Sequence, residues 1–264
     1  MRRTLRIALA SFLLSATVLL KAQAPPAATI VPFSEAGVTF QKYDPAIAPN
    51  FAAFAAANPD VARWLPYADI LTNATSKIIV AVTVLWCPPG APATPSEGDC
   101  LTLRQDSLYI ATGVAAAPHV RRLVTPADIW PEGLAGNPGE YLSVSNASLR
   151  KQAEFLEANP GGRVELDVVI LEDGTVLGPD HSKTVELLEA RQQAMDIVSK
   201  KLLELLDRQQ DPAPLLTEYA GSGSDLRDPI AFWCARLAKI LLAATNPRAI
   251  LAELSTLPRI NFHR

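Results

Sequence analysis

The sequence predicts an α+β fold, in which an antiparallel β-sandwich is followed by a C-terminal helical region. Two observations predict it. Between about residues 30 and 180, runs of apolar and β-branched residues alternate with loops rich in proline and glycine, as in all-β domains. From Ser182 to the end, apolar residues recur with the helical period. We therefore expect a mainly antiparallel β-sandwich domain at residues 25–180 and an α-helical region at 181–264, packed on it or beside it.

The first 24 residues have the pattern of a signal peptide. Arg2, Arg3 and Arg6 form a basic segment, residues 7–20 are apolar, and Ala-Gln-Ala at 22–24 matches the small-x-small cleavage pattern. The apolar run of about 14 residues is shorter than the ~20 that a membrane-spanning helix needs. We therefore expect residues 1–24 to be removed and the protein to be exported, either to the periplasm or by secretion, with no stable membrane span.

The cleavage site and the export route each have an alternative. Pro25 directly follows the Ala-Gln-Ala triplet, and a proline at this position disfavours cleavage, so cleavage after Ala22 is the other choice. Arg2-Arg3 also resembles the twin-arginine signal that exports folded proteins, although Arg6 stands where that signal prefers an apolar residue. Both routes lead to export.

Two of the three cysteines have the spacing of a disulfide pair. Cys87 ends one strand-like run and Cys100 begins the next, with a proline-rich loop between them. In an oxidising compartment we expect a bridge there, which offsets the closure entropy of the long loop. Cys234 lies in a helical run and is expected to be a buried thiol, with an intermolecular disulfide as the alternative.

The composition is that of a globular protein and excludes some partners. Charged residues make up 19% of the chain and hydrophobic residues 49%. The net charge is −3, so no overall positive field attracts nucleic acid or an anionic membrane. We expect no nucleic-acid partner.

The strongest β signal is the run at residues 77–86. It is apolar on both faces, which predicts a central strand covered on both sides. One face is expected to carry Ile78, Val80, Val82, Val84 and Trp86. The next run changes phase near residues 105–106, which predicts a β-bulge or a break, and Asp173-Gly174 predicts a hairpin with a type I′ turn. These strands look like an immunoglobulin-like sandwich only in architecture, which carries no functional inference.

The helical region is predicted to start with a long amphipathic helix at residues 183–209. Arg191 interrupts its apolar stripe, and we interpret it as an arginine that snorkels at the edge of the core. The alternative is a partner-binding site, or a buried ion pair with an acid of the β-domain. Asp211, Asp228 and Asn246 each precede a proline, which predicts the starts of three further helices.

The sequence has no motif for catalysis or for a cofactor. It lacks GxSxG, HExxH, CxxC, GxGxxG and the phosphate-binding loop pattern. The histidines His119, His181 and His263 have no motif around them. We therefore assign no catalytic residue, no metal and no cofactor, and we leave enzymatic activity undecided while favouring its absence.

Five residues remain as candidates for a binding site, beside Arg191. Glu165 and Asp167 form a carboxylate pair on one strand face, because residues two apart in a strand point the same way. His119, Arg121 and Arg122 form a small basic spot that suits an anion. An exposed strand edge guarded by charge is the alternative for this spot.

These observations favour an exported, non-catalytic binding or scaffolding module that binds another envelope or extracellular protein. The alternative is a secreted hydrolase or carbohydrate-binding protein with an unrecognised site. An exposed Trp64 or Trp130 beside acids in a cleft would favour that alternative. A third hypothesis treats the long helix as an oligomerisation seam; the sequence itself assigns no oligomeric state.

Overall fold

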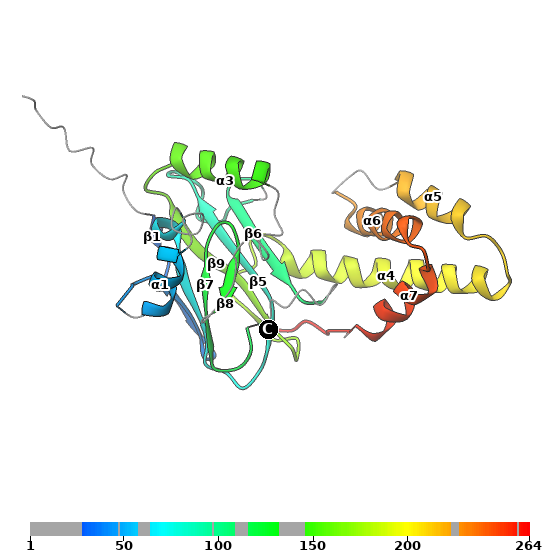
Figure 1. Cartoon of the computed structure of the whole chain (residues 1–264), viewed down its shortest axis with the longest axis horizontal. Helices are drawn as coiled ribbons and strands as arrows, with labels where there is room; N and C mark the ends of the chain where they lie inside the picture. Colours follow the sequence, from blue (N-terminus) through cyan, green and yellow to red (C-terminus); the bar gives the residue numbers. More distant parts are fainter. Residues whose placement is uncertain are drawn as a thin grey trace, which may run out of the picture.

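In the computed structural model the chain has mixed α and β structure, with two sheets rich in antiparallel pairs and a C-terminal helical region (Figure 1). The structure describes residues 28–46, 48–57, 64–96, 98–108, 116–131, 146–222, 227–257 and 259–264. The predicted signal peptide at residues 1–24 lies outside the described residues.

The first sheet, the β5 sheet, has the predicted central strand in its interior. Its spatial order is β1 (Thr29–Ile30), β9 (Arg163–Leu171), β5 (Ile79–Cys87) and β6 (Leu101–Asp106), with β10 (Val176–Leu177) beside β9. β1 pairs with β9 in parallel, and the other pairs are antiparallel. Every residue of β5 is buried, which confirms a strand covered on both faces.

The second sheet, the β4 sheet, is antiparallel throughout. Its spatial order is β2 (Phe33–Glu35), β3 (Val38–Lys42), β4 (Asp69–Asn73), β7 (Val120–Val124) and β8 (Ile129–Pro131). Between β3 and β4 the chain forms α1 (Pro49–Ala57) and the short 3-10 helix η1 (Leu65–Tyr67). Phe51 of α1 packs on one face of this sheet with Ile70 and Leu123.

Side chains from both sheets meet in one apolar core. Phe40, Leu71 and Val124 come from the β4 sheet, and Val84 and Trp86 come from the β5 sheet. The helix α3 (Asn146–Ala158) adds apolar side chains to the same core. Burial of these large side chains is the main favourable contribution to the stability of this part of the chain.

The opposite face of the β5 sheet packs against the start of α4 (Thr184–Asp207). Val168 and Ile170 of β9 contact Leu188 of α4 in a separate apolar cluster. From there α4 extends away from the sheets, and the remaining helices gather along its far half (Figure 1). The β region and the helical region therefore share α4.

The helices α5 (Ala213–Ser222), α6 (Pro229–Ala243) and α7 (Pro247–Thr256) form the helical region with α4. Asp228 and Asn246 cap α6 and α7 as predicted, each accepting a hydrogen bond from a main-chain nitrogen three residues on. The apolar stripe of α4 is buried within this region. The shared core includes Met195, Val198, Leu202, Leu216, Leu237 and Leu241.

The C-terminal segment returns from α7 to the β region, as the red end of the chain shows in Figure 1. Ile260 donates a main-chain hydrogen bond to Oε1 of Gln192 at 2.9 Å, and the Gln192 amide donates back to the Ile260 carbonyl. His263 then pairs with the hairpin through bonds to Gly174 and Val176. The two regions are thus joined by α4 and by this segment.

The predicted face of β5 is wrong at the start of the strand. Ile79 pairs with Leu171 and Ala81 with Ile170, so Val80 has no partner of its own on β9. This bulge reverses the alternation, because the extra residue shifts every earlier side chain to the other face. Ile79 therefore lies in the core between the sheets, whereas Val80 packs on the face that meets α4.

The predicted hairpin exists, but its turn is not of type I′. Gly174 has a φ of 93°, whereas Asp173 is not among the described residues with positive φ, and a type I′ turn needs both. The loop is longer, since Leu171 donates to the carbonyl of Thr175 across it. A Cβ at Gly174 would lie 2.1 Å from the Asn261 oxygen, so the C-terminal segment also requires glycine here.

Cys87 and Cys100 are joined by a disulfide between the end of β5 and the residue before β6, consistent with the expected bridge. Cys234 is a buried thiol in α6. β6 stops at Asp106, the point where the sequence predicts a bulge or a break, and residues 109–115 lie outside the described part of the chain.

Candidate functional site

Asp167 is fully buried where β9 meets the start of α4. A register shift between Thr83 and Val84 makes Asp167 an extra residue on β9, and this bulge directs it to the side of the sheet that α4 covers. Its carboxylate accepts hydrogen bonds from the main-chain nitrogens of His181, at 2.7 Å, and Ser182, at 3.0 Å. The Ser182 hydroxyl is a third donor.

A chain of hydroxyl groups continues from Ser182 into the β5 sheet. The Ser182 hydroxyl lies 2.8 Å from that of Thr184, which lies 2.8 Å from that of Thr83 on β5. Arg104 of β6 donates to the Thr184 hydroxyl and to the Ser182 carbonyl. We call Asp167, Ser182, Thr184, Thr83 and Arg104 the α4 clamp, because these bonds attach the first turn of α4 to three strands or their connections.

Asp180 caps the same helix end. Its carboxylate accepts hydrogen bonds from the main-chain nitrogens of Thr184, at 2.6 Å, and Val185, at 3.3 Å. Burial raises the pKa of Asp180, while these two hydrogen bonds act in the opposite direction. Asp167 and Asp180 at this end of α4 therefore both have main-chain donors, and these hydrogen bonds hold the chain in place.

Arg191 does not snorkel, so that interpretation is wrong. The residue is 5% exposed, and its guanidinium donates two hydrogen bonds to Asp106 on β6, at 3.1 Å and 2.6 Å. It also lies 5.2 Å from the ring centre of Trp233 on α6. The alternative, a buried ion pair with an acid of the β region, is what the structure contains. The apolar surroundings favour this pairing, since a buried charge without a partner is costly.

Glu165 lies two residues before Asp167 on β9 but has a different partner. Its carboxylate is 3.2 Å from Nε of Arg163, whose other guanidinium nitrogens donate to the carbonyls of Ala91 and Pro92. These bonds tie the loop inside the disulfide to β9. Glu165 and Asp167 are near each other, but Glu165 binds Arg163 and Asp167 binds the start of α4.

The predicted basic spot divides over the two faces of the β4 sheet. Arg121 pairs with Thr72 and Arg122 with Leu71, and successive residues of a strand point to opposite faces. His119 is exposed in the turn before β7. β8 pairs with β7 from Arg122 onward, so a strand edge does not explain Arg122, and the described pairing with β8 does not reach His119 or Arg121. Burial lowers the pKa of Arg122.

Of the two tryptophans that could mark a sugar-binding cleft, only Trp64 has a described side chain. Trp64 is 3% exposed and belongs to the core between the sheets. The side chain of Trp130 lies outside what the structure describes. The observation that would favour a carbohydrate site is therefore absent for Trp64.

Asp69 of β4 is a second fully buried carboxyl group, and no motif in the sequence marks it. Neither of its oxygens has a hydrogen-bond partner among the described residues. Burial raises its pKa well above the usual range, and the nearby Lys42 on β3 only partly opposes this. Asp69 thus differs from Asp167, which has three donors.

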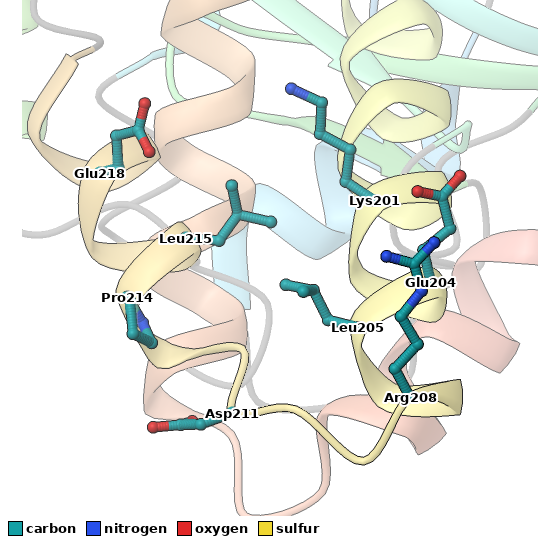
Figure 2. Close-up of a pocket in the computed structure, with 8 residues that line it drawn as sticks. All are labelled: Lys201, Glu204, Leu205, Arg208, Asp211, Pro214, Leu215 and Glu218. Atoms are coloured by element: carbon teal, nitrogen blue, oxygen red, sulfur yellow. The ribbon is translucent and has the colours of Figure 1, made fainter.

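An open groove lies at the other end of α4, between its last two turns and α5 (Figure 2). Its volume is about 480 Å³. Leu205 and Leu215 point toward one another across it and form an apolar floor (Figure 2). The remaining lining residues are Lys201 and Glu204 on α4, Arg208 at its C-cap, and Asp211, Pro214 and Glu218 on or next to α5.

The charged side chains of this α4–α5 groove are exposed, and Lys201 of α4 interacts across it with Glu218 and Tyr219 of α5. No ion pair or hydrogen bond of the described residues involves the side chains of Glu204, Arg208 or Glu218. Asp211 uses one oxygen to cap α5, and Lys201 lies 5.4 Å from the ring centre of Tyr219. This end of α4 therefore offers charges that the fold itself does not use.

A second hollow of about 480 Å³ lies beside the α4 clamp. It is lined by Ser96, His181, Ser182, Lys183, Glu186, Leu187, Arg227 and Pro229. Lys183 and Glu186 form an ion pair at 3.6 Å on its rim. Most of the polar groups that line this hollow therefore already have partners, either in the α4 clamp or in the Lys183–Glu186 ion pair.

Within the part of the chain that the structure describes, no three or more His, Cys, Asp or Glu side chains are placed to hold a metal ion. Likewise, none of the helices in the described ranges has the length and apolar character to cross a bilayer. No protein-family model matches the chain, and no curated protein or solved structure is significantly similar to it.

The α4–α5 groove was not predicted from the sequence, although its charges were visible there. Glu204 and Arg208 are part of a run of alternating charges four residues apart on the helix at 183–209. Such a run indicates a solvated face. Pro214 and Leu215 of the next helix complete the lining of the groove. Their position beside α4 depends on how α5 folds back along α4, which no local pattern in the sequence predicts.

Proposed function

We propose that the protein is an exported, non-catalytic binding or scaffolding module of the cell envelope or extracellular space. In this proposal residues 1–24 are removed, residues 25–180 form a β-sandwich from the two sheets, and residues 181–264 are a helical arm. Its partner is another envelope or extracellular protein. The Cys87–Cys100 disulfide supports an oxidising compartment, periplasmic or extracellular.

One observation carries the proposal, namely the difference in how polar groups are used along α4. The acids next to the start of α4 are occupied, because Asp167 and Asp180 accept bonds from the main chain and Glu165 binds Arg163. A general acid or base must be able to exchange its proton with a substrate. At the other end of α4, exposed charged side chains surround an apolar floor, and among them Glu204 and Arg208 have no partner among the described residues, which suits binding.

The test starts from the protein recovered from its own host under non-reducing conditions and analysed by native mass spectrometry. We expect the mass of a chain without its leader, with one internal disulfide, and a second protein retained after mild cross-linking. Recovery of the uncleaved chain from the cytoplasm contradicts the export part of the proposal.

The rival function is tested on the same material with ester, glycoside and peptide substrates. Turnover that is lost in both Asp167→Asn and Glu165→Gln would overturn the proposal in favour of a hydrolase. Arg121→Gln is the matched control, because Arg121 is a polar strand residue on the other sheet. We expect no turnover above the buffer rate in any of these proteins.

A further inference from the structure

We propose that the α4–α5 groove binds a short segment of the partner protein, in which apolar side chains lie between a basic residue and an acidic residue. This inference rests on the proposed function and names the chemistry of the partner. The apolar side chains cover Leu205 and Leu215, the basic residue faces Asp211 and Glu218, and the acidic residue faces α4.

The size of the groove suits a peptide segment. Its volume of about 480 Å³ is in the range of sites that enclose small ligands. From Lys201 to Arg208 the helix rises by about 10 Å, which is the length of about three residues in an extended chain. The surface of a folded protein does not fit into such a groove, whereas the tip of a loop or a terminal segment of a protein does.

The floor of the groove favours apolar side chains. Leu205 and Leu215 are half-buried, and each precedes a leucine that belongs to the helical core or packs against it, Leu206 and Leu216. A ligand that covers the two half-buried side chains removes apolar surface from water next to an existing core. This contribution does not depend on salt.

The charged residues on the two walls of the groove determine which charges on a ligand are favoured. The α4 wall carries two cations, Lys201 and Arg208, on either side of Glu204, whereas the α5 wall carries the two anions Asp211 and Glu218. A segment that is acidic at both ends is repelled by the α5 wall, and a segment with one end of each charge is attracted by both walls. No close ion pair among the described residues joins the two walls, but Lys201 and Glu218 attract one another at longer range, so a ligand that faces Glu218 competes with that attraction.

The groove is held open by the packing behind it. α6 contacts both α4 and α5, and its residues Cys234, Leu237 and Leu241 are buried between them. The helical core therefore holds the two walls in place, together with the contact between Lys201 of α4 and the Tyr219 ring of α5. A preformed site of this kind loses little entropy when a ligand binds.

The inference is tested with the chain from residue 25 to 264 and with capped synthetic tetrapeptides. Lys-Leu-Leu-Glu is the probe, and Lys-Ser-Ser-Glu and Glu-Leu-Leu-Glu are its apolar and charge controls. Binding is followed by amide NMR shifts. We expect saturable shifts at residues of α4 and α5 that line the groove, and a dissociation constant at least about fivefold lower for the probe than for either control.

Two matched variants locate the site. Leu205→Lys removes half of the floor and is expected to weaken probe binding about tenfold, whereas Leu203→Lys is expected to leave it unchanged. Leu203 is 43% exposed on the same helix and does not line the groove. Glu218→Lys is expected to reverse the charge preference, so that Glu-Leu-Leu-Glu binds more tightly than the probe.

Shifts elsewhere on the molecule, equal effects of the two leucine variants, or an unchanged preference in Glu218→Lys each overturn the inference. Its failure is distinguishable from failure of the proposed function. If a natural partner still binds the Leu205→Lys variant, the proposed function stands and the groove is not the binding site. If neither a partner nor the probe binds the unmodified protein, both the inference and the proposed function are wrong.

Discussion

The two ends of α4 use polar residues in opposite ways. At the start of the helix, Asp167, Ser182 and Thr184 are buried or half-buried and bonded to one another and to the β5 sheet. At its end, Arg208 and Glu204 are exposed on the wall of a groove and have no partner among the described residues. The helix is continuous between these ends, so a single element carries a structural attachment and a surface that suits binding.

This difference shows that the amount of charge in a region does not indicate function by itself. Buried polar groups are stable only when their hydrogen bonds are satisfied, so they are typically engaged in architecture. Exposed charges cost little to leave unpaired and are available to a ligand. The following four predictions test whether the two ends differ in this way, and they run from the largest expected effect to the smallest.

Asp167→Asn is expected to lower the free energy of unfolding by about 3–4 kcal/mol, because an amide cannot accept hydrogen bonds from all three donors that now bind the carboxylate. Urea unfolding at pH 7 measures the loss. Glu218→Gln, at the groove end, serves as the control and should match the unmodified protein. A loss below about 1 kcal/mol for Asp167→Asn would show that the clamp does not hold α4.

Arg191→Met is expected to cost about 3 kcal/mol, since it leaves Asp106 in a site that is largely shielded from water. The double variant Arg191→Met with Asp106→Leu removes both charges and is expected to recover most of this loss. The double-mutant cycle, measured by urea unfolding, separates the pair from simple packing. Additive losses would mean that the two residues are not coupled.

Asp69→Asn is expected to change stability in the opposite sense to Asp167→Asn, with a gain of about 1–2 kcal/mol at pH 7. Burial raises the folded-state pKa of Asp69 above its usual value of 3.8, and its carboxylate has no described donor. The stability that the protonated group contributes is complete below about pH 4 and is lost as the pH rises through the folded pKa.

The pH profile provides the check on Asp69. Urea unfolding of both proteins from pH 3 to pH 8 should show equal stability at the acid end and a gap that opens as the pH rises. A gap that is constant with pH would mean that Asp69 has the same pKa folded and unfolded.

Arg208→Gln is expected to change the free energy of unfolding by less than about 0.5 kcal/mol, because an exposed side chain without a partner contributes little. Thermal unfolding is sufficient to detect a larger effect. Arg191→Gln, which removes the arginine in the first half of α4, is the comparison and should be clearly destabilised. If both arginines mattered equally for stability, the two ends of α4 would not differ as described.

Local patterns in the sequence predicted the elements well. The spacing of Cys87 and Cys100 at strand ends, the capping residues before the prolines at 229 and 247, and the change to a helical period after Ser182 all correspond to features of the structure. Each of these depends on residues close together in the chain. The mixed α+β class with a C-terminal helical region follows from them.

Contacts between distant residues were the part that could not be predicted. Arg191 and Asp106 are 85 residues apart, and no local pattern connects them. The bulge at Val80 is likewise set by its partner strand β9, because a run that is apolar on both faces gives no signal of its phase. The sequence marks Asp167 as one member of a carboxylate pair. Its hydrogen-bond donors, the main-chain nitrogens of His181 and Ser182, can be identified only once the position of the start of α4 is known.

Amide hydrogen exchange at His181 and Ser182 tests most directly whether the start of α4 is a rigid attachment. Both amides precede the helix, in a turn where exchange is normally fast. Because Asp167 accepts their hydrogen bonds, we predict that they open with a free energy close to that of the β9 amides, and that Asp167→Asn removes this protection while the amides of α5 are unchanged. Rapid exchange at both positions in the unmodified protein would contradict the assignment of Asp167 to architecture.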